Sequence, residues 1–430
     1  MTSWLRRWGS LLPLYGAEII VMIGFGALLP VLPLYIQEHG LDAVQLGIII
    51  AAWPIAKLIF EPVFGWWADR HSRKPQMVAG LVILGIASLL PLFLTSFAAL
   101  FILRFIAGAA TGLYDPAARG MIVDATHEDE RGEAFGFYGA FQIGGFVIGP
   151  AVGAFGSELF GGYAFPFLFT FLLSLAGAVV VALILAPRPK VADRADSRHD
   201  LEAQPPPPGV PFTASETAAI PTDPLPAAVQ APISALFNRT VVAALVLTFG
   251  LHLTFGTYEV IWSIYLVTLG ASVAWVGLTF VLFGIPEMIV APIAGRLVDR
   301  RGPVRFVVAS GVAIMLSGAV YAFAREPLLP SAVAPLEAAA TAAMLPALYS
   351  ILARGTPAGR ASTVQGLFGA VSTLALVVAS IVAGYLFERD IALPFWFFIA
   401  GMGVCLVIGL LIYRSARRPL AAGPLTEAAG

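Results

Sequence analysis

Charged side chains stand in stretches of this sequence that are otherwise apolar. They are Glu18, Lys57, Glu61, Arg104, Asp115, Glu259, Glu287 and Glu337, and His252 lies in one of the same stretches. A charge at the centre of a bilayer costs roughly 3 kcal/mol on insertion scales. We therefore expect most of these side chains to face the protein interior or water. Because burial favours the neutral form of a carboxyl group, acids in such places are candidate proton carriers.

The spacing of these residues suggests pairs. Lys57 and Glu61 are four residues apart, which lets them form an ion pair on one helix. His252 and Glu259 are seven apart, or two helical turns, and could share a proton pathway. A histidine that is satisfied within the interior is the alternative. The sequence shows no cluster typical of a metal site and no nucleophile–base constellation of an enzyme.

The elements that hold these residues follow from the composition. Of 430 residues, 59% are hydrophobic and 12% are charged, against about 25% charged in ordinary soluble domains. This excludes a soluble enzyme and a disordered chain. The formal net charge of −1 gives no basic field for a nucleic acid. A single cysteine, Cys405, allows no disulfide framework.

Twelve apolar runs are long enough to cross a bilayer as helices, which takes about 20 residues each. They span 11–36, 44–66, 76–97, 98–123, 133–156, 163–186, 240–268, 272–294, 304–324, 330–353, 361–386 and 392–413. Membrane β-barrels alternate apolar and polar residues, and these runs do not. The predicted fold is an all-α integral membrane protein with twelve transmembrane helices.

Lysine and arginine residues fall mostly on one side of these runs. Of the 25, 21 lie on the side of the two termini, which the positive-inside rule places in the cytoplasm. The proline-rich stretch 187–239 has too few large apolar side chains to pack, so we interpret it as a cytoplasmic linker. It is a passive tether or else a regulatory docking segment. It separates an N-terminal bundle, 1–186, from a C-terminal bundle, 240–413, and 414–430 is a predicted cytoplasmic tail.

The two halves of the sequence match at one fixed offset of 230 residues. Matching pairs are Phe25 and Phe255, Tyr35 and Tyr265, Gly40 and Gly270, Gly47 and Gly277, Gly65 and Gly295, Gly136 and Gly366, and Gly139 and Gly369. An even number of spans in each half leaves the halves parallel, related by an axis along the membrane normal. This predicts two pseudo-symmetric six-helix bundles that rock about a central site, as in an alternating-access transporter. The offset also matches Lys57 with Glu287, which suggests an ion pair between the bundles.

The sequence lacks a phosphate-binding loop. None of its three lysines, Lys57, Lys74 and Lys190, follows a glycine. We therefore expect an ion gradient, by default of protons, to drive the protein without a bound cofactor.

The end of the second run carries glycine, acidic and basic residues at fixed spacing. Gly65, Asp69, Arg70, Arg73 and Lys74 resemble the loop motif of the major facilitator superfamily, and the second half repeats it at Gly295, Asp299 and Arg300. The resemblance covers nearly the whole chain outside the linker and tail. It implies that the motif latches the two bundles in the outward-facing state, with Asp124 and Arg131 as its partners.

The fifth run carries a series of small residues, Gly136, Gly145, Gly149, Pro150 and Gly153. Small residues along one face permit close contact between helices. This spacing resembles a signature found mainly in the drug/proton antiporters of the superfamily. Arg104 in the fourth run resembles the intramembrane arginine that the superfamily links to proton transfer.

The resemblance also places the first and fourth runs along a central cavity. It implies that Glu18 is a site for protons and cations, with a structural partnership with the fourth run as the alternative. Asp115 is a second candidate, with a capping or packing role as the alternative. Glu259 and Glu287 are further candidates, and we expect Glu337 near the outer rim.

Together these features predict a proton-coupled exporter of lipophilic, cationic small molecules. We expect a monomer in the inner (plasma) membrane with both termini in the cytoplasm. Inside the membrane acids outnumber bases six to two, which suits a lipophilic cation, and aromatic side chains could add cation–π contacts. An exporter or flippase of an amphiphilic lipid, sugar or other metabolite is the alternative. The repeated motif and the buried acids argue against a third reading, a membrane receptor that transports nothing.

Overall fold

The computed structural model describes residues 8–126, 130–185, 232–357 and 360–417. Within these residues every regular element is helical. Twelve helical segments are long and apolar enough to cross a membrane. The all-α fold with twelve spans that the sequence predicts is confirmed.

The N-terminal bundle holds the first six spans. The first span is broken into α2 (Leu12–Leu28) and α3 (Leu32–Glu38), with Pro30 in the break, where its missing N–H removes a helical hydrogen bond. The others are α4 (Ala43–Arg70), α5 (Arg73–Leu89) with the short η1 (Leu90–Leu92), α6 (Phe97–Ala125), α7 (Arg131–Leu159) and α8 (Ala164–Leu183).

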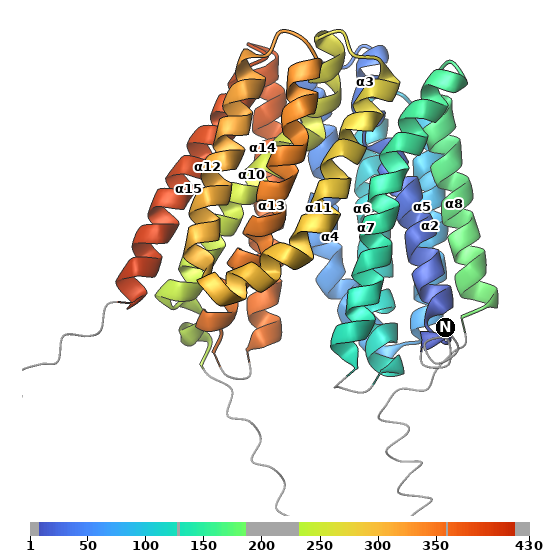
Figure 1. Ribbon diagram of the computed structural model, residues 1–430. Coiled ribbons are helices and arrows are strands. Elements are labelled where there is room, and N and C mark those ends of the chain that lie inside the picture. The colour runs from blue at the N-terminus through green and yellow to red at the C-terminus, as the bar shows by residue number, and fades with distance from the viewer. Residues whose placement is uncertain (1–7, 127–129, 186–231, 358–359, 418–430) are drawn as a thin grey trace, which may run out of the picture.

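The C-terminal bundle holds the other six spans. After the short η2 (Ile233–Phe237) come α10 (Arg239–Thr268), α11 (Val273–Arg301), α12 (Pro303–Phe323), α13 (Leu328–Gly355), α14 (Ala361–Phe387) and α15 (Leu393–Arg417). The bundles stand side by side and meet along two helix pairs, α4 with α14 and α7 with α11 (Figure 1).

The predicted segment boundaries need two corrections. The last residues of the 187–239 segment are structured, because η2 lies there and the Asn238 side chain caps α10 while donating to the backbone carbonyl of Gly355 at 2.7 Å. Helix α15 runs to Arg417, so it includes the first residues of the predicted tail. The rest of the predicted linker, to residue 231, and of the tail lies outside the described residues.

The structure repeats individual contacts at the offset of 230. The Tyr35 hydroxyl donates to the carbonyl of Pro91 at 2.6 Å, and the Tyr265 hydroxyl donates to the carbonyl of Tyr321 at 2.7 Å. Gly40 and Gly270 both adopt positive φ, 77° and 94°, in the turns before α4 and α11. Each repeat therefore builds the same local structure at corresponding positions.

The two ends of the molecule differ in how closely the bundles approach. We call the end that carries the chain termini the termini end and the opposite one the far end; the ribbons converge toward the far end (Figure 1). At the far end, a Cβ added to Gly47 would lie 2.3 Å from the carbonyl oxygen of Ser380, and one added to Gly277 would lie 2.4 Å from the Cβ of Ala154. Only glycine permits such contact.

Several glycines near the termini end have open surroundings, in contrast to Gly47 and Gly277. A Cβ added to any of five of them would meet no described atom within 4 Å outside its own helix backbone; these are Gly136, Gly139, Gly295, Gly366 and Gly369. Gly65 meets only Pro116 of its own bundle, at 3.6 Å. The bundles are thus in contact at the far end and apart at the termini end.

Candidate functional site

A cavity of about 520 Å³ lies between the two bundles. It is lined mainly by α2, α4, α6 and α7 of one bundle and by α10, α11, α13 and α14 of the other. Its aromatic side chains are Phe25, Trp53, Tyr114, Phe146, Phe255, Tyr258, Trp262, Phe280 and Phe283, and its charged side chains are Lys57, Asp115, Glu259, Glu287 and Glu337. A mostly apolar cavity with a few polar groups is the common form of a small-molecule site.

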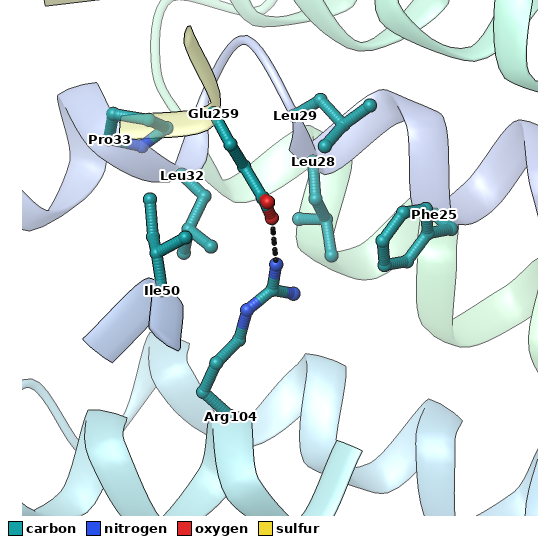
Figure 2. Close-up of a pocket in the computed structure, with 8 residues that line it drawn as sticks. All are labelled: Phe25, Leu28, Leu29, Leu32, Pro33, Ile50, Arg104 and Glu259. Atoms are coloured by element: carbon teal, nitrogen blue, oxygen red, sulfur yellow. Dashed lines mark hydrogen bonds and ion pairs between the residues drawn. The ribbon is translucent and has the colours of Figure 1, made fainter. Parts of the chain in front are cut away.

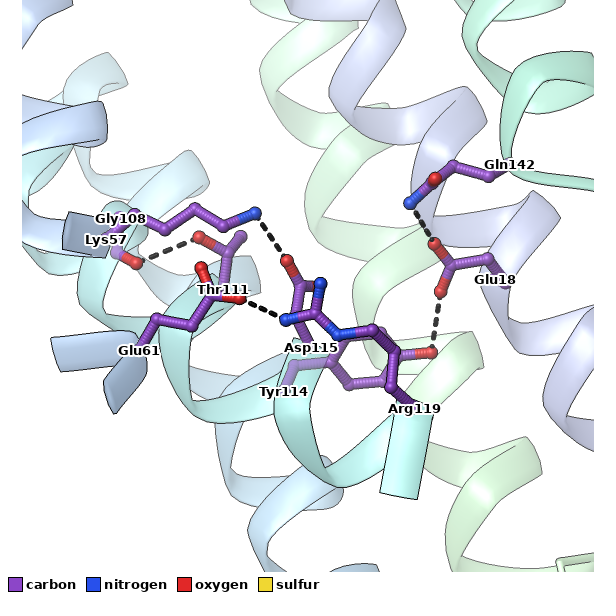
Figure 3. Close-up of polar contacts among 9 residues, drawn as sticks. All are labelled: Glu18, Lys57, Glu61, Gly108, Thr111, Tyr114, Asp115, Arg119 and Gln142. Atoms are coloured by element: carbon purple, nitrogen blue, oxygen red, sulfur yellow. Dashed lines mark hydrogen bonds and ion pairs between the residues drawn. The ribbon is translucent and has the colours of Figure 1, made fainter. Parts of the chain in front are cut away.

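The charged side chains on the N-terminal wall of the cavity pair between α4 and α6 (Figure 3). The ammonium nitrogen of Lys57 lies 2.5 Å from a carboxylate oxygen of Asp115. One helical turn nearer the termini end, Glu61 pairs with Arg119. The predicted pair between Lys57 and Glu61 is therefore wrong. Each residue finds its partner on α6, where Asp115 and Arg119 have the same spacing of four.

Glu18 lies behind this wall rather than on it. Its side chain is fully buried, and its two carboxylate oxygens accept hydrogen bonds from the Tyr114 hydroxyl at 3.0 Å and from the Gln142 amide at 2.9 Å (Figure 3). Tyr114 and Gln142 both line the cavity. The structure thus shows the partnership with the fourth span that was the alternative role for Glu18, and it connects Glu18 to the cavity through these two donors.

An ion pair joins the bundles near the far end of the cavity (Figure 2). Arg104 on α6 donates to Glu259 on α10 at 3.3 Å, and both side chains are less than one fifth exposed. The Arg104 guanidinium also lies 5.8 Å from the centre of the Phe25 ring. The predicted ion pair between Lys57 and Glu287 is wrong. The pair that joins the bundles is a different one, Arg104 with Glu259. The offset aligns positions in sequence and does not show which side chains face each other.

His252 is not part of the cavity lining. Its Nδ1 lies 2.8 Å from the carbonyl oxygen of Thr248 on the preceding turn, and its ring packs near Phe255 and Phe368. This is the satisfied interior histidine that was the alternative to a proton pathway shared with Glu259.

The C-terminal wall carries two carboxyl groups in different surroundings. Glu337 is 1% exposed and accepts hydrogen bonds from the hydroxyls of Tyr258 and Tyr321, each at 2.7 Å. Its expected place near the outer rim is wrong, because the two tyrosines hold it inside the bundle. Glu287 lines the cavity without a hydrogen bond or ion pair to any residue in the described part of the chain.

The motif at the end of α4 lies at the termini end. Arg73 lies 3.1 Å from Asp124 at the end of α6 and 3.8 Å from Asp69, whose side chain is 73% exposed. Lys74 donates to the carbonyl of Leu185 at 2.7 Å, just beyond α8. These contacts all stay within the N-terminal bundle.

The remaining residues of the motif mark helix ends. Arg70 stacks over Trp66, with its guanidinium carbon 3.8 Å from the ring centre. Arg131 begins α7, while Asp299 and Arg300 lie in the last turn of α11.

A glycine that the sequence analysis passed over makes the Arg73 contact with Asp124 possible. A Cβ added to Gly120 on α6 would lie 1.1 Å from a guanidinium nitrogen of Arg73. The only signal in the sequence was a glycine four residues before the acid.

The glycine series on α7 packs against α2. Cβ atoms added to Gly145, Gly149 and Gly153 would lie 2.7, 2.5 and 2.0 Å from the backbone oxygens of Ile19, Ile23 and Ala27, and Pro150 lies next to Gly26. Gly136 lies outside this contact. These small residues thus bring the first and fifth spans into direct backbone contact.

The comparisons with known proteins agree with this architecture. A family model described as Major Facilitator Superfamily matches residues 14–324 and 244–429, so the chain belongs to that superfamily. It is 29% identical over 177 residues to the quinolone resistance protein NorA of Staphylococcus aureus, which covers 41% of this chain and 45% of that one. It is 30% identical over 184 residues to multidrug resistance protein 2 of Bacillus subtilis, covering 43% and 44%. The chain thus spans less than half the length of the curated relatives it matches.

Solved structures share the fold. A bacterial homologue of the human lysosomal transporter Spinster, in an inward-facing and unoccupied conformation, has a TM-score of 0.71 and 17% identity over 96% of this chain and 99% of that one. The nucleoside transporter NupG has a TM-score of 0.67 and 14% identity over 94% and 99%. The protein is thus a member of the major facilitator superfamily with twelve described helices long and apolar enough to cross a membrane.

Proposed function

We propose that this protein exports lipophilic cations in exchange for protons by alternating access. It works in the inner (plasma) membrane with both termini in the cytoplasm. The proton gradient drives it without a bound cofactor. One chain suffices, because both walls of the cavity come from the same chain.

The charge of the cavity carries the proposal. Lys57 neutralises Asp115, and Arg104 neutralises Glu259. Glu287 and Glu337 have no cationic partner in the described part of the chain, and Glu287 has no polar partner there at all. An isolated carboxylate in an apolar site is costly unless a proton or a cation compensates it. A proton and a cationic substrate would therefore compete for Glu287, and competition for one group is the simplest basis for exchange.

The apolar part of the cavity supports the lipophilic half of the proposed substrate. Tyr258, Trp262, Phe280 and Phe283 line the same wall as Glu287. Aromatic faces attract cations and also bury apolar surface. The relatives named for quinolone and multidrug resistance support export of small drug-like molecules, without specifying their charge.

The repeat supports alternating access. The described conformation is closed at the far end and separated at the termini end, so the cavity would face the cytoplasm. The glycines that pack at the far end, Gly47 and Gly277, have counterparts near the termini end, Gly65 and Gly295, on the same two helices. A rocking motion would separate the first pair and bring the second pair into contact with the other bundle.

Transport in proteoliposomes tests the proposal. The probe is tetraphenylphosphonium, with a neutral amphiphile as comparison, and lumenal pH is recorded for wild type, Glu18→Gln and Glu287→Gln. Glu326→Gln serves as control, because Glu326 precedes α13 at the far end and is exposed. We expect proton movement that depends on the cation in wild type and control, and its loss in Glu287→Gln.

Other results would change the assignment. Proton movement that survives in Glu287→Gln but not in Glu18→Gln would move the coupling site to the network behind the N-terminal wall. Transport of the neutral amphiphile alone would favour a lipid or metabolite exporter. Cation transport without proton movement would overturn the proposed coupling.

A further inference from the structure

Two acidic residues at the far end occupy positions where a helix disfavours them. Glu158 lies in the last turn of α7, and Glu388 is the C-terminal cap of α14. The C-terminal end of a helix carries partial negative charge, so a carboxylate there is destabilising on its own. Neither residue forms an ion pair within the described part of the chain. Both side chains are exposed to water, and a hydrogen-bond donor from the protein would further offset this cost.

Such a donor comes from the opposite bundle. Glu388 accepts a hydrogen bond from the backbone N–H of Ala43, the first residue of α4, at 2.6 Å. Glu158 accepts one from the backbone N–H of Ala274, the second residue of α11, at 2.8 Å. Each carboxylate thus contacts the N-terminal end of a helix, α4 or α11. This end carries partial positive charge, and its first N–H groups have no acceptor within the helix. Each bundle therefore gives one carboxylate and receives one.

The helices already have caps of their own. Asp42 accepts from the N–H of Gln45 at the start of α4, and Ser272 accepts from that of Trp275 at the start of α11. The carboxylates from the other bundle are thus additional to normal capping. Because these helices are capped without them, the two carboxylates mainly stabilise the contact between the bundles.

The two carboxylates are related by the repeat, and their donors differ by one position, since Ala43 corresponds to Val273 and the donor on α11 is Ala274. Glu158 and Glu388 are 230 residues apart, as are Ala154 and Gly384, which lie one turn earlier on the same helices. A Cβ added to Gly384 would lie 2.1 Å from the carbonyl oxygen of Ala43. Each carboxylate thus lies beside one of the closest approaches between the bundles.

From this geometry we infer that Glu158 and Glu388 form a reciprocal latch that holds the far end closed. The inference rests on the proposed function in one respect, that the far end opens during transport. Any separation of α4 from α14, or of α7 from α11, breaks one of these hydrogen bonds and leaves an acid at a helix C-terminus. The latch therefore stabilises the described conformation relative to one that is open at the far end.

Distance measurements between spin labels test the latch. Labels are placed on cysteines at Gly162 and Leu328, exposed far-end positions in opposite bundles, in a Cys405→Ser background. Glu158→Gln and Glu388→Gln are compared singly and together, with Glu326→Gln as control. We expect each substitution to raise the ratio of far-end-open to far-end-closed molecules by roughly two- to fivefold, and the pair by the product. Alanine at each position should shift it further, since glutamine keeps an acceptor oxygen.

The outcomes separate the latch from the transport cycle. Two distance populations in wild type, with more of the long distance in the latch variants than in the control, would support the latch. Two populations in wild type and no change in the variants would overturn it. A single, unchanged distance in all proteins, with and without cation and at every pH, would overturn alternating access and the latch with it.

Discussion

The two bundles are alike in how they pack and different in the charges they bring to the cavity. Tyr35 and Tyr265 make the same hydrogen bond in each, and Gly47 and Gly277 make the same close contact with the other bundle. The acids of the cavity do not repeat in this way. At the offset of 230, Asp115 corresponds to Leu345, and Glu18, which lies behind the cavity wall, corresponds to Thr248.

The difference separates two roles. Contacts present in both halves, such as those of Tyr35 and Tyr265, hold the helices of each bundle and the bundles together. Charges present in one half make the cavity walls unequal: the N-terminal wall pairs its charges, whereas the C-terminal wall leaves Glu287 without a partner in the described chain. A cation entering between them would be directed to one wall.

The largest expected effect comes from Glu287, the unpaired carboxylate of the C-terminal wall. Glu287→Gln should weaken binding of tetraphenylphosphonium by at least about 30-fold, because the variant removes the charge that faces the cation. The melting temperature should change little, since Glu287 has no partner to lose. Binding is measured by equilibrium titration of the purified protein, with Glu326→Gln as control.

The same comparison predicts that exchanging the charges of Lys57 and Glu287 between the two walls does not restore cation binding. In the double variant Lys57→Glu and Glu287→Lys, Asp115 would face a carboxylate instead of its ammonium partner. Recovery of binding in this double variant would contradict the present pairing and favour an ion pair between Lys57 and Glu287.

The repeated glycines should give equal effects in the two halves. Gly47→Ala and Gly277→Ala each introduce a Cβ about 2.3–2.4 Å from an atom of the other bundle. Overpacking of this kind costs about 1–3 kcal/mol. We expect both variants to populate a far-end-open state, measured by the spin labels described above. Gly403→Ala is the matched control, because its added Cβ meets only Met315 of the same bundle, at an ordinary distance of 3.5 Å. A strong effect of only one far-end variant would break the functional symmetry.

Gly120→Ala should disturb the termini end alone. The added methyl group displaces the Arg73 guanidinium, which weakens its ion pair with Asp124 and lowers the free energy of unfolding by roughly 1–2 kcal/mol. Thermal unfolding in detergent measures the loss. Arg73→Ala should remove most of the additional effect of Gly120→Ala; full additivity of the two substitutions would exclude this contact as the cause.

The smallest effect is expected at the repeated tyrosines. Tyr35→Phe and Tyr265→Phe each remove one buried hydrogen bond to a backbone carbonyl, worth about 1 kcal/mol. Both variants should transport normally and melt slightly earlier. Unequal shifts in melting temperature would show that the two halves differ in stability as well as in charge.

Much of the fold could be read from the sequence because its signals are local. Apolar length alone sets the helices, so predicted runs such as 240–268 and observed helices such as α10 agree within a few residues. The interruption at Pro30 and the extension of α15 to Arg417 differ from the prediction, because they depend on backbone hydrogen bonds that hydropathy does not report.

The sequence by itself determined that twelve helices are long and apolar enough to cross a membrane, that the halves repeat, and which acids lie in those helices. These properties follow from composition and from spacing along one chain. Only the tertiary structure decided that Lys57 pairs with Asp115, that Arg104 reaches Glu259 across the bundles, and that Glu337 is held by two tyrosines. Such pairings depend on which faces of distant helices meet, and packing across the bundles sets that orientation. The tertiary structure alone also showed that the far end is closed, with Glu158 and Glu388 accepting hydrogen bonds from helices of the opposite bundle.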